Sequence, residues 1–298
     1  MSALAPTRWQ PLADLPARAW RGVGGVFTDI DDTLTTEGAI TPDALAALAA
    51  LQRDGVRVVA ITGRPVGWSE AFAAAWPLDA IVAENGAVAL LGPQAARHGQ
   101  GQDLPISSQT SLQRPPYGRE QLSKLYLDDA TTRRTNFAHL QQVAARVLRE
   151  VPGTTLAQDS PGRETDIAID HSEFAQLSAP QIDQVVALMR AEGLRATVSS
   201  IHINGWIGEH DKWQGARWIA RTLYGIDDLA AEQQRWLFIG DSTNDQVMFE
   251  HFTHSVGVAN IARFADKLKH VPRYVTTAER GAGFAEMARA LLAQRHLR

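Results

Sequence analysis

The segment VFTDIDDT, residues 26–33, runs from an apolar stretch directly into three closely spaced carboxylates. Residues 26–30 have the apolar and β-branched character of a buried strand, and Asp29, Asp31 and Asp32 fall where that strand ends. Carboxylates this close repel one another, whereas a hard cation such as Mg²⁺ neutralises them and prefers their oxygen atoms. Acidic clusters also occur in turns and at helix starts, so this segment alone leaves a structural origin open.

Further strand-like runs alternate with helical patterns along the chain. Residues 42–55 are predicted to form a helix, because Thr41-Pro42 is a typical helix start, leucines recur at helical spacing and Gly55 ends the pattern. The other strand-like runs span residues 56–62, 80–85, 235–241 and 255–260. This alternation is typical of a Rossmann-like α/β core, an open and mainly parallel sheet with helices on both faces. Ligands of such sheets bind beyond the carboxyl ends of the strands.

Two of these strand ends carry groups suited to a phosphorylated ligand. Residues 62–64 (Thr-Gly-Arg) offer a hydroxyl and backbone N–H groups that could seat a phosphate. Asp241 and Asp245 follow the fourth run and could share one metal with the first acidic cluster, while Gly240 permits close backbone approach. Arg64 could instead pair with a surface carboxylate.

Lys212 follows a helix-start signal at Asp211. A lysine near a helix N-terminus is unfavourable against the helix dipole, so a nearby anion would stabilise it there. For this residue the alternative is a solvated surface charge.

The stretch between the third and fourth strand runs has a different composition and is interpreted as an inserted α+β cap domain. Residues 94–120 are rich in Gln, Gly, Ser and Pro, as in an extended or mobile loop. Helical patterns follow at 136–151 and 178–193. Two strand-like segments, 162–170 and 199–205, alternate polar with apolar residues. A sheet that is polar on one face and covered by helices on the other is suited to act as a lid.

Composition excludes several classes of function. A net charge of -4 provides no general attraction to nucleic acid or anionic lipid, so no nucleic-acid partner is expected. The absence of cysteine excludes thiolate nucleophiles and cysteine-ligated zinc. No segment resembles a signal peptide or a membrane span, which predicts a cytoplasmic protein without a membrane partner. A P-loop and an HExxH zinc motif are also absent.

Four segments in this order, DIDDT, ITGR, a lysine before a helix, and GDSTND, resemble the four motifs of the haloacid dehalogenase superfamily. The sequence Glu84-Asn85-Gly86-Ala87 after the third strand, followed by a long insertion before the lysine, is similar to subclass IIB, the group of Cof-like and sugar-phosphate phosphatases. The resemblance covers nearly the whole chain. It implies a core domain at 1–87 and 209–298, interrupted by a cap domain at 88–208.

The resemblance implies a Mg²⁺-dependent phosphatase acting on a sugar phosphate or a similar small phosphorylated metabolite. Asp29 would be the nucleophile that forms an aspartyl-phosphate, and Asp31 the general acid and base. Mg²⁺ would be held by Asp29, the Asp31 main chain and Asp241, with support from Asp245. The residues implied to bind phosphate are Thr62, Gly63 and Lys212. Those implied to play supporting roles are Asn244, Asn85 and Arg64.

Substrate selection is expected to lie in the cap. Candidate residues for contacts to the substrate are Arg163, Glu164, Asp166, His202 and Asn204. The alternative is that these side chains form the solvated face of a half-buried sheet. A sugar phosphomutase would keep the same core residues, and a non-catalytic phosphometabolite-binding protein would keep the fold. The sequence makes no prediction of the oligomeric state.

Overall fold

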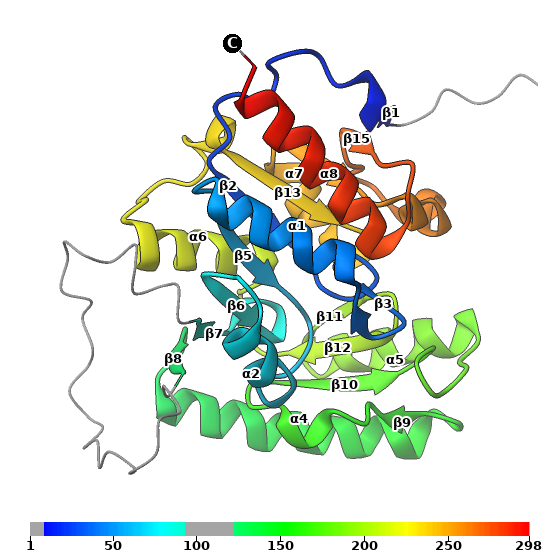
Figure 1. Cartoon of the computed structure of the whole chain (residues 1–298). Coiled ribbons are helices and arrows are strands. Elements are labelled where there is room, and N and C mark those ends of the chain that lie inside the picture. Colours follow the sequence, from blue (N-terminus) through cyan, green and yellow to red (C-terminus); the bar gives the residue numbers. More distant parts are fainter. Residues whose placement is uncertain (1–8, 93–121, 298) are drawn as a thin grey trace, which may run out of the picture.

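A computed structural model of the chain describes residues 9–92 and 122–297 (Figure 1). The segment 94–120, expected to be an extended loop, lies outside the described residues. In the part that is described, no helix combines the length and the apolar character needed to cross a bilayer.

A nine-stranded sheet forms the centre of the molecule, and it confirms the expected α/β class. Its strands follow the order β1-β15-β14-β13-β2-β5-β6-β7-β8, and all neighbours up to β6 are parallel. The bounds are β1 Gln10–Pro11, β15 Tyr274–Val275, β14 His254–Gly257, β13 Trp236–Gly240, β2 Gly25–Thr28, β5 Arg57–Ile61, β6 Ala80–Ala83, β7 Val88–Leu91 and β8 Ser123–Tyr126. A small hairpin, β3 Thr35–Thr36 with β4 Ala39–Ile40, follows β2.

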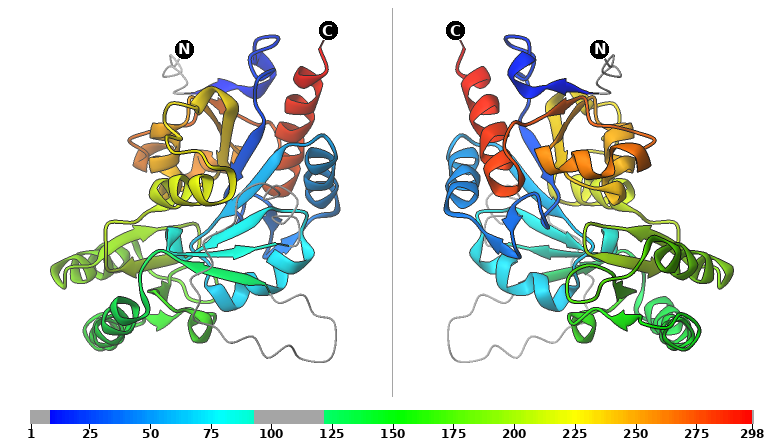
Figure 2. Two further views of the ribbon diagram at one scale, coloured as in Figure 1. Left: turned by 90° about the vertical axis from the view of Figure 1, so that its left-hand side faces the viewer. Right: turned by 90° about the vertical axis from the view of Figure 1, so that its right-hand side faces the viewer.

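Helices cover both faces of this sheet. On one face α1 (Pro42–Arg53), α2 (Val66–Ala75) and α8 (Arg280–Arg295) pack over a buried cluster that includes Val26, Val58 and Ile239. On the other face α6 (Lys212–Tyr224) and α7 (Gln246–His251) pack over Phe27, Val59 and Phe238. Alternate residues of each central strand therefore pack into the two buried clusters on opposite faces of the sheet. For this reason these strands are apolar throughout. The views in Figure 2 show the sheet between these two layers.

A second, four-stranded antiparallel sheet carries the residues expected in the cap. Its order is β11-β12-β10-β9, with bounds β9 Thr155–Leu156, β10 Asp166–Asp170, β11 Arg195–Val198 and β12 His202–Trp206. Helices α4 (Ala130–Glu150) and α5 (Ala179–Ala191) cover one face, where Val143 and Val185 share a buried cluster with Ile203 of β12. Its other face, which bears polar side chains, meets the carboxyl ends of the large sheet, as Figures 1 and 2 show.

Helix α4 begins earlier than the expected residue 136. The side chain of Asp129 accepts hydrogen bonds from the amides of Thr131 and Thr132 and so caps the helix. The first turns are polar and largely exposed, so they lack the apolar periodicity used to predict helices.

The large sheet continues beyond residue 87. Strand β7 pairs antiparallel with β6, and β8 pairs antiparallel with β7, although both lie in the 88–208 range expected for the cap. We propose that the inserted domain comprises the elements between β8 and α6, with β7 and β8 part of the core domain.

The chain returns from the second sheet to the core through residues 207–211. Trp206 is buried, and its indole N–H donates to the carbonyl of His210 at 2.9 Å. The imidazole of His210 stacks on the same indole, with ring centroids 5.7 Å apart. Burial lowers the pKa of His210 to about 4, against the raising influence of Asp128 and Asp211. This connection fixes the start of α6 and hence the position of Lys212.

Replacement of His210 by Gln should make the protein less sensitive to acid. The folded pKa of about 4 is below the unfolded value of 6.5, so the unfolded state binds more protons between these values. Stability is then lost as pH falls from about 6.5 to about 4, by up to about 3 kcal/mol from this group. Urea unfolding at pH 7 and at pH 4.5 measures the loss, which should be smaller in the variant. His270→Gln, a change at an exposed position, should keep the wild-type loss; an equal loss in His210→Gln would contradict the assignment.

Candidate active site

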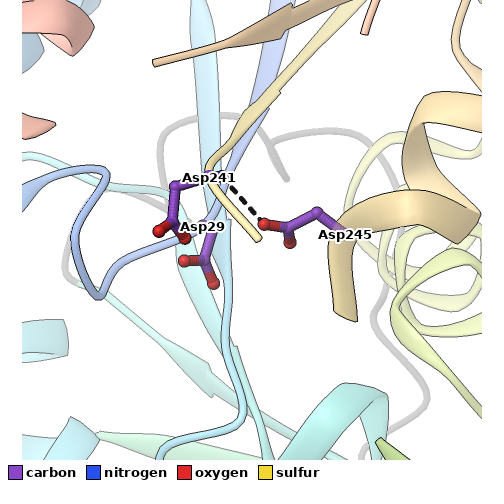
Figure 3. Close-up of side chains that lie close together, drawn as sticks. All are labelled: Asp29, Asp241 and Asp245. Atoms are coloured by element: carbon purple, nitrogen blue, oxygen red, sulfur yellow. Dashed lines mark hydrogen bonds between the residues drawn. The ribbon is translucent and has the colours of Figure 1, made fainter. Parts of the chain in front are cut away.

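Three neighbouring parallel strands end in the residues predicted to carry the chemistry. β13, β2 and β5 lie side by side, and Asp241, Asp29 and Thr62 directly follow them. The amide of Asp29 donates to the carbonyl of Ile239 at 2.9 Å, which ties the two acidic ends together. Single carboxylate oxygens of Asp29, Asp241 and Asp245 all lie within 4.8 Å of one another (Figure 3). Residues more than two hundred positions apart in the chain therefore share one site.

Lys212 lies inside this acidic cluster. Its Nζ donates to Asp29 Oδ1 at 2.6 Å and to Asp245 Oδ1 at 2.7 Å, and the residue is 2% exposed. The position at the start of α6, with Asp211 capping the helix through the amide of Gln214, agrees with the sequence prediction. A surface location for this lysine is excluded by its burial.

Two glycines allow the close approach of backbone in the site. Gly86 has a φ of +114°, and a Cβ there would lie 2.5 Å from the carbonyl oxygen of Asp211, so glycine lets the turn after β6 contact the start of α6. A Cβ on Gly240 would lie 2.5 Å from Asp245 Oδ2. That oxygen accepts the amides of Asp241 and Ser242 at 3.0 and 3.1 Å, which closes the loop after β13.

The electrostatics of the cluster favour a bound cation. Burial, together with the nearby Asp245 and Asp31, raises the pKa of Asp29 to about 8 despite the opposing effect of Lys212. Burial and the neighbouring carboxylates raise the pKa of Asp241 well above its ordinary value. Three buried carboxylates against one ammonium group leave negative charge that a divalent cation would neutralise.

The carboxylate oxygens of the cluster suit a divalent metal ion. Asp241 Oδ2 accepts from Asn260 Nδ2 at 3.1 Å, whereas Asp241 Oδ1 is buried without a hydrogen-bond partner in the described part of the chain. An orphaned buried carboxylate oxygen is costly unless something positive binds it. Carboxylate oxygens at this spacing are ligands that hard divalent cations prefer, so Asp29, Asp241 and Asp245 fit such an ion.

Asp31 is held by Arg64, which the sequence predicted only as a supporting residue. Arg64 Nε lies 3.0 Å from both carboxylate oxygens of Asp31. The same guanidinium group pairs with Asp159 at 3.0 Å and with Glu173 at 2.8 Å. Burial lowers the pKa of Arg64, but Asp31 and Glu173 outweigh this effect and raise the pKa above its ordinary value. Arg64 thus connects the core to the four-stranded sheet through an ion-pair network.

The pocket above Asp29 is almost closed. Its free volume is about 10 Å³. Its lining includes the predicted residues Asp29, Asp31, Thr62, Gly63, Arg64, Asn244, His202 and Asn204. The loop between β11 and β12 contributes Ser199, Ser200 and Ile201 to the same pocket. The space holds no more than a water molecule, so a metabolite requires the two sheets to separate.

Most of the predicted cap residues are buried against the core. Asp166 accepts hydrogen bonds from three side chains. Its Oδ1 accepts from Arg163 at 2.7 Å, and its Oδ2 accepts from Asn204 at 3.2 Å and from Asn85 at 3.4 Å. Arg163 and Asn204 both also donate to the carbonyl of Gly63, at 3.0 and 3.2 Å. Burial raises the pKa of Asp166 to about 7, against the lowering influence of Arg163. The interpretation as a solvated sheet face is wrong for these side chains.

Two predicted cap residues differ in their surroundings. His202 lines the pocket, and its Nε2 lies 2.7 Å from Glu173, which supplies the partner that the sequence did not reveal. Glu164 lies away from the pocket lining and pairs with Tyr126 at 2.7 Å and with Lys124 at 3.2 Å. The structure therefore brings His202 to the site and Glu164 to a different contact between the sheets.

Glu173 and Glu84 are site residues that the sequence prediction missed. Glu173 joins His202 to Arg64, and its pKa is lowered to about 2, since these two hydrogen bonds outweigh the effect of burial. Glu84 is fully buried and accepts from the amides of Val66, Glu164 and Thr165 at 2.5 to 3.1 Å. In the sequence, Glu173 could have been found as an acidic residue in the polar run after β10. Glu84 could have been found as an acidic residue at the end of an otherwise apolar strand.

Comparison with known proteins gives two kinds of match. Residues 26–107 match the family model of haloacid dehalogenase-like hydrolases. A search of curated proteins finds no match.

Solved structures with the same fold cover nearly the whole chain. A Thermoplasma acidophilum protein has a TM-score of 0.62 at 15% identity and covers 91% of this chain and 98% of its own. The sucrose-phosphatase of Synechocystis, solved with sucrose and phosphate, has a TM-score of 0.59 at 16% identity and covers 91% of this chain and 98% of its own. A haloacid dehalogenase-like hydrolase from B. subtilis has a TM-score of 0.56 at 16% identity, with 90% and 99% covered. At these identities the likeness shows the fold.

Proposed function

We propose that this chain, whose residues 26–107 match the family model of haloacid dehalogenase-like hydrolases, hydrolyses phosphomonoesters through a phosphorylated Asp29. The observation that carries the proposal is the meeting of Asp29, Asp241, Asp245 and Lys212 at adjacent strand ends. The proposed substrate is a sugar phosphate or a similar small phosphorylated metabolite. A sucrose-phosphatase and a trehalose-6-phosphate phosphatase related protein have the same fold, and polar residues of the second sheet line the pocket; both observations support this class.

The residues divide the reaction into two displacements. The Asp29 carboxylate attacks phosphorus, while the Asp31 carboxyl group gives its proton to the departing ester oxygen, which leaves as an alcohol. Asp31 then takes a proton from water, and the water oxygen attacks phosphorus to release inorganic phosphate and regenerate Asp29. Lys212 Nζ, the hydroxyl of Thr62 and the backbone at Gly63 hold the phosphoryl oxygens. Because Asp31 is paired with Arg64 in the closed pocket, that ion pair has to loosen before proton transfer.

We propose Mg²⁺ as the cation, held by Asp29, Asp241 and Asp245. It would screen the repulsion between the Asp29 carboxylate and the phosphate and polarise the phosphoryl group. Asn244 has a supporting role, because its side-chain oxygen accepts a hydrogen bond from the hydroxyl of Ser242 at 2.8 Å and so fixes the loop after β13.

Release of phosphate from a panel of phosphomonoesters tests the proposal. The purified chain with Mg²⁺ should release phosphate from sugar phosphates, lose this activity with EDTA and regain it when Mg²⁺ is restored. A coupled assay for isomerised sugar phosphate separates a hydrolase from a phosphomutase. Failure to release phosphate from any member of a broad panel with Mg²⁺ present would count against the function.

Asp241→Asn should abolish stabilisation by Mg²⁺. A ligand at about 100-fold its Kd adds about 3 kcal/mol to the stability of the wild type. In the metal-free protein the same variant should be more stable than the wild type, because it removes a buried carboxylate whose charged form is disfavoured. Thermal unfolding with EDTA and with Mg²⁺ measures both effects.

Asp227→Asn provides the matched control for this experiment. Asp227 is exposed, and its exchange should leave the response to Mg²⁺ unchanged. An undiminished Mg²⁺ response in Asp241→Asn would show that the cation binds elsewhere.

A further inference from the structure

Asn260 lies just beyond the end of β14, the strand next to β13 in the large sheet. It closes the last strand-like run of the sequence, residues 255–260, and the sequence prediction assigned it no role. The residue is buried, with only 3% exposed. A buried amide group is costly unless its donors and its acceptor all have partners. The identity of these partners therefore indicates what the side chain does.

The polar atoms of this amide group contact three separate segments. Nδ2 donates to Asp241 Oδ2 and to the carbonyl of Asp32, both at 3.1 Å. Oδ1 accepts from the backbone amide of Arg280 at 2.9 Å. Because a backbone amide can only donate, the atom that faces Arg280 has to be the oxygen, and this fixes which way the side chain lies. Asn260 thus joins the loops after β2 and β13 to the start of α8.

The backbone around Asn260 is itself held in place. The amide of Val258 donates to the carbonyl of Gly240 at 3.1 Å, directly before Asp241. The amide of Ala259 donates to the carbonyl of Ala278 at 3.2 Å, shortly before α8. The side chain therefore reaches Asp241 from a fixed base rather than from a free loop.

The contact with Asn260 distinguishes the two carboxylate oxygens of Asp241. Oδ2 accepts from Asn260, whereas Oδ1 has no hydrogen-bond partner among residues 9–92 and 122–297. A carboxylate group turns readily about its Cβ–Cγ bond, so a donor on one oxygen also fixes the direction of the other. Figure 3 shows this carboxylate beside that of Asp29. Mg²⁺ lies about 2.0 to 2.1 Å from its ligand oxygens, closer than a water molecule does, so buried oxygens are able to enclose it.

Arg263 is the alternative partner of Asp241, and it is less suited to this role. Its guanidinium nitrogen lies 3.7 Å from Asp241 Oδ2, beyond hydrogen-bond distance, and its side chain is 47% exposed. The same nitrogen lies closer to Asp32, at 3.2 Å. A positive charge beside Asp241 opposes a cation, whereas the neutral amide of Asn260 fixes the carboxylate without adding charge. The two residues should therefore affect cation affinity in opposite directions.

We propose that Asn260 is a positioning residue of the cation site, which holds the Asp241 carboxylate in the orientation that binds the ion together with Asp29. This role rests on the cation site of the proposed function. Loss of a hydrogen-bond partner of a metal ligand typically lowers metal affinity by about 10- to 100-fold.

Calorimetric titration of the metal-free full chain with Mg²⁺ tests the role. Asn260→Ala should bind Mg²⁺ about 10- to 100-fold more weakly than the wild type. Asn260→Ser is a milder variant, because water can enter beside the small hydroxyl group and accept from the amide of Arg280, and it should bind Mg²⁺ severalfold more weakly. Thermal unfolding in EDTA checks that each variant is folded at the temperature of the titration.

Two further variants separate the positioning of Asp241 from a general loosening of this region. Thr276 is buried, and its hydroxyl donates to the carbonyl of Ala278 at 2.6 Å rather than to the acidic cluster. Thr276→Val should therefore loosen the segment before α8 and leave Mg²⁺ affinity unchanged. Arg263→Gln should bind Mg²⁺ at least as tightly as the wild type, since it removes a charge of the same sign as the ion.

The outcomes distinguish this role from the proposed hydrolysis, because the titration does not use turnover. Wild-type affinity in both Asn260 variants, or an equal loss of affinity in either Thr276→Val or Arg263→Gln, would overturn the positioning role. A wild type that does not bind Mg²⁺ would overturn it together with the cation site. If the wild type binds Mg²⁺ and both Asn260 variants lose affinity, the role stands even where no phosphate is released, and only the hydrolase activity is then refuted.

Discussion

Replacement of Asp29 by Asn is expected to reduce phosphate release by at least about 10⁴-fold with Mg²⁺ present. The change removes the attacking oxygen's charge and one ligand of the cation, and loss of a nucleophile commonly costs this much or more. The fold should remain intact, because burial already raises the pKa of Asp29 to about 8 and an amide oxygen still accepts from Lys212. Phosphate release and thermal unfolding measure the two properties.

Asp43→Asn is the control for this experiment, since Asp43 is exposed in the first turn of α1 and is not among the residues that line the pocket. It should keep wild-type activity. Activity of Asp29→Asn equal to that of the control would refute Asp29 as the nucleophile.

Replacement of Lys212 by Met is expected to destabilise the metal-free protein by about 3 to 5 kcal/mol, the usual effect of removing one partner of a buried ion pair. Lys212 contacts both Asp29 and Asp245, and without its ammonium group these buried carboxyl groups lose their counter-charge and a hydrogen-bond donor. Adding Asp245→Asn to the same chain should recover part of the loss, because it removes one of the two charges. Urea unfolding in EDTA measures all three proteins.

The exposed Lys269 provides the matched control, and Lys269→Met should change stability by less than about 0.5 kcal/mol. Phosphate release by Lys212→Met should also fall by about 10² to 10³-fold, through loss of a donor to the phosphoryl oxygens. Wild-type stability of Lys212→Met in EDTA would contradict the buried pairing.

The core of the site was predictable because a parallel sheet gathers its carboxyl ends. Once residues 26–30, 56–62 and 235–241 are read as parallel strands, Asp29, Thr62 and Asp241 have to lie near one another. Position along the chain carries no information about this proximity, but strand order does. The start of α6 was predictable for a local reason, the capping by Asp211.

The cap contacts were not predictable in the same way. Arg64, Asp159 and Glu173 meet only because the second sheet packs on the first, and no spacing in the sequence encodes that packing. The burial of Asp166 and Asn204 has the same origin: a polar face predicts exposure unless another polar surface covers it. Strands β7 and β8 were missed because their antiparallel pairing breaks the alternation of strand and helix that identified the others.

The nearly filled pocket above Asp29 has a consequence for the timing of catalysis. With about 10 Å³ free, no phosphate ester enters or leaves while the second sheet rests on the first. On the proposed mechanism, each cycle includes at least one opening in which the guanidinium group of Arg64 exchanges Asp159 and Glu173 for water. The frequency of that opening would then set an upper limit on turnover, at the junction of the two sheets.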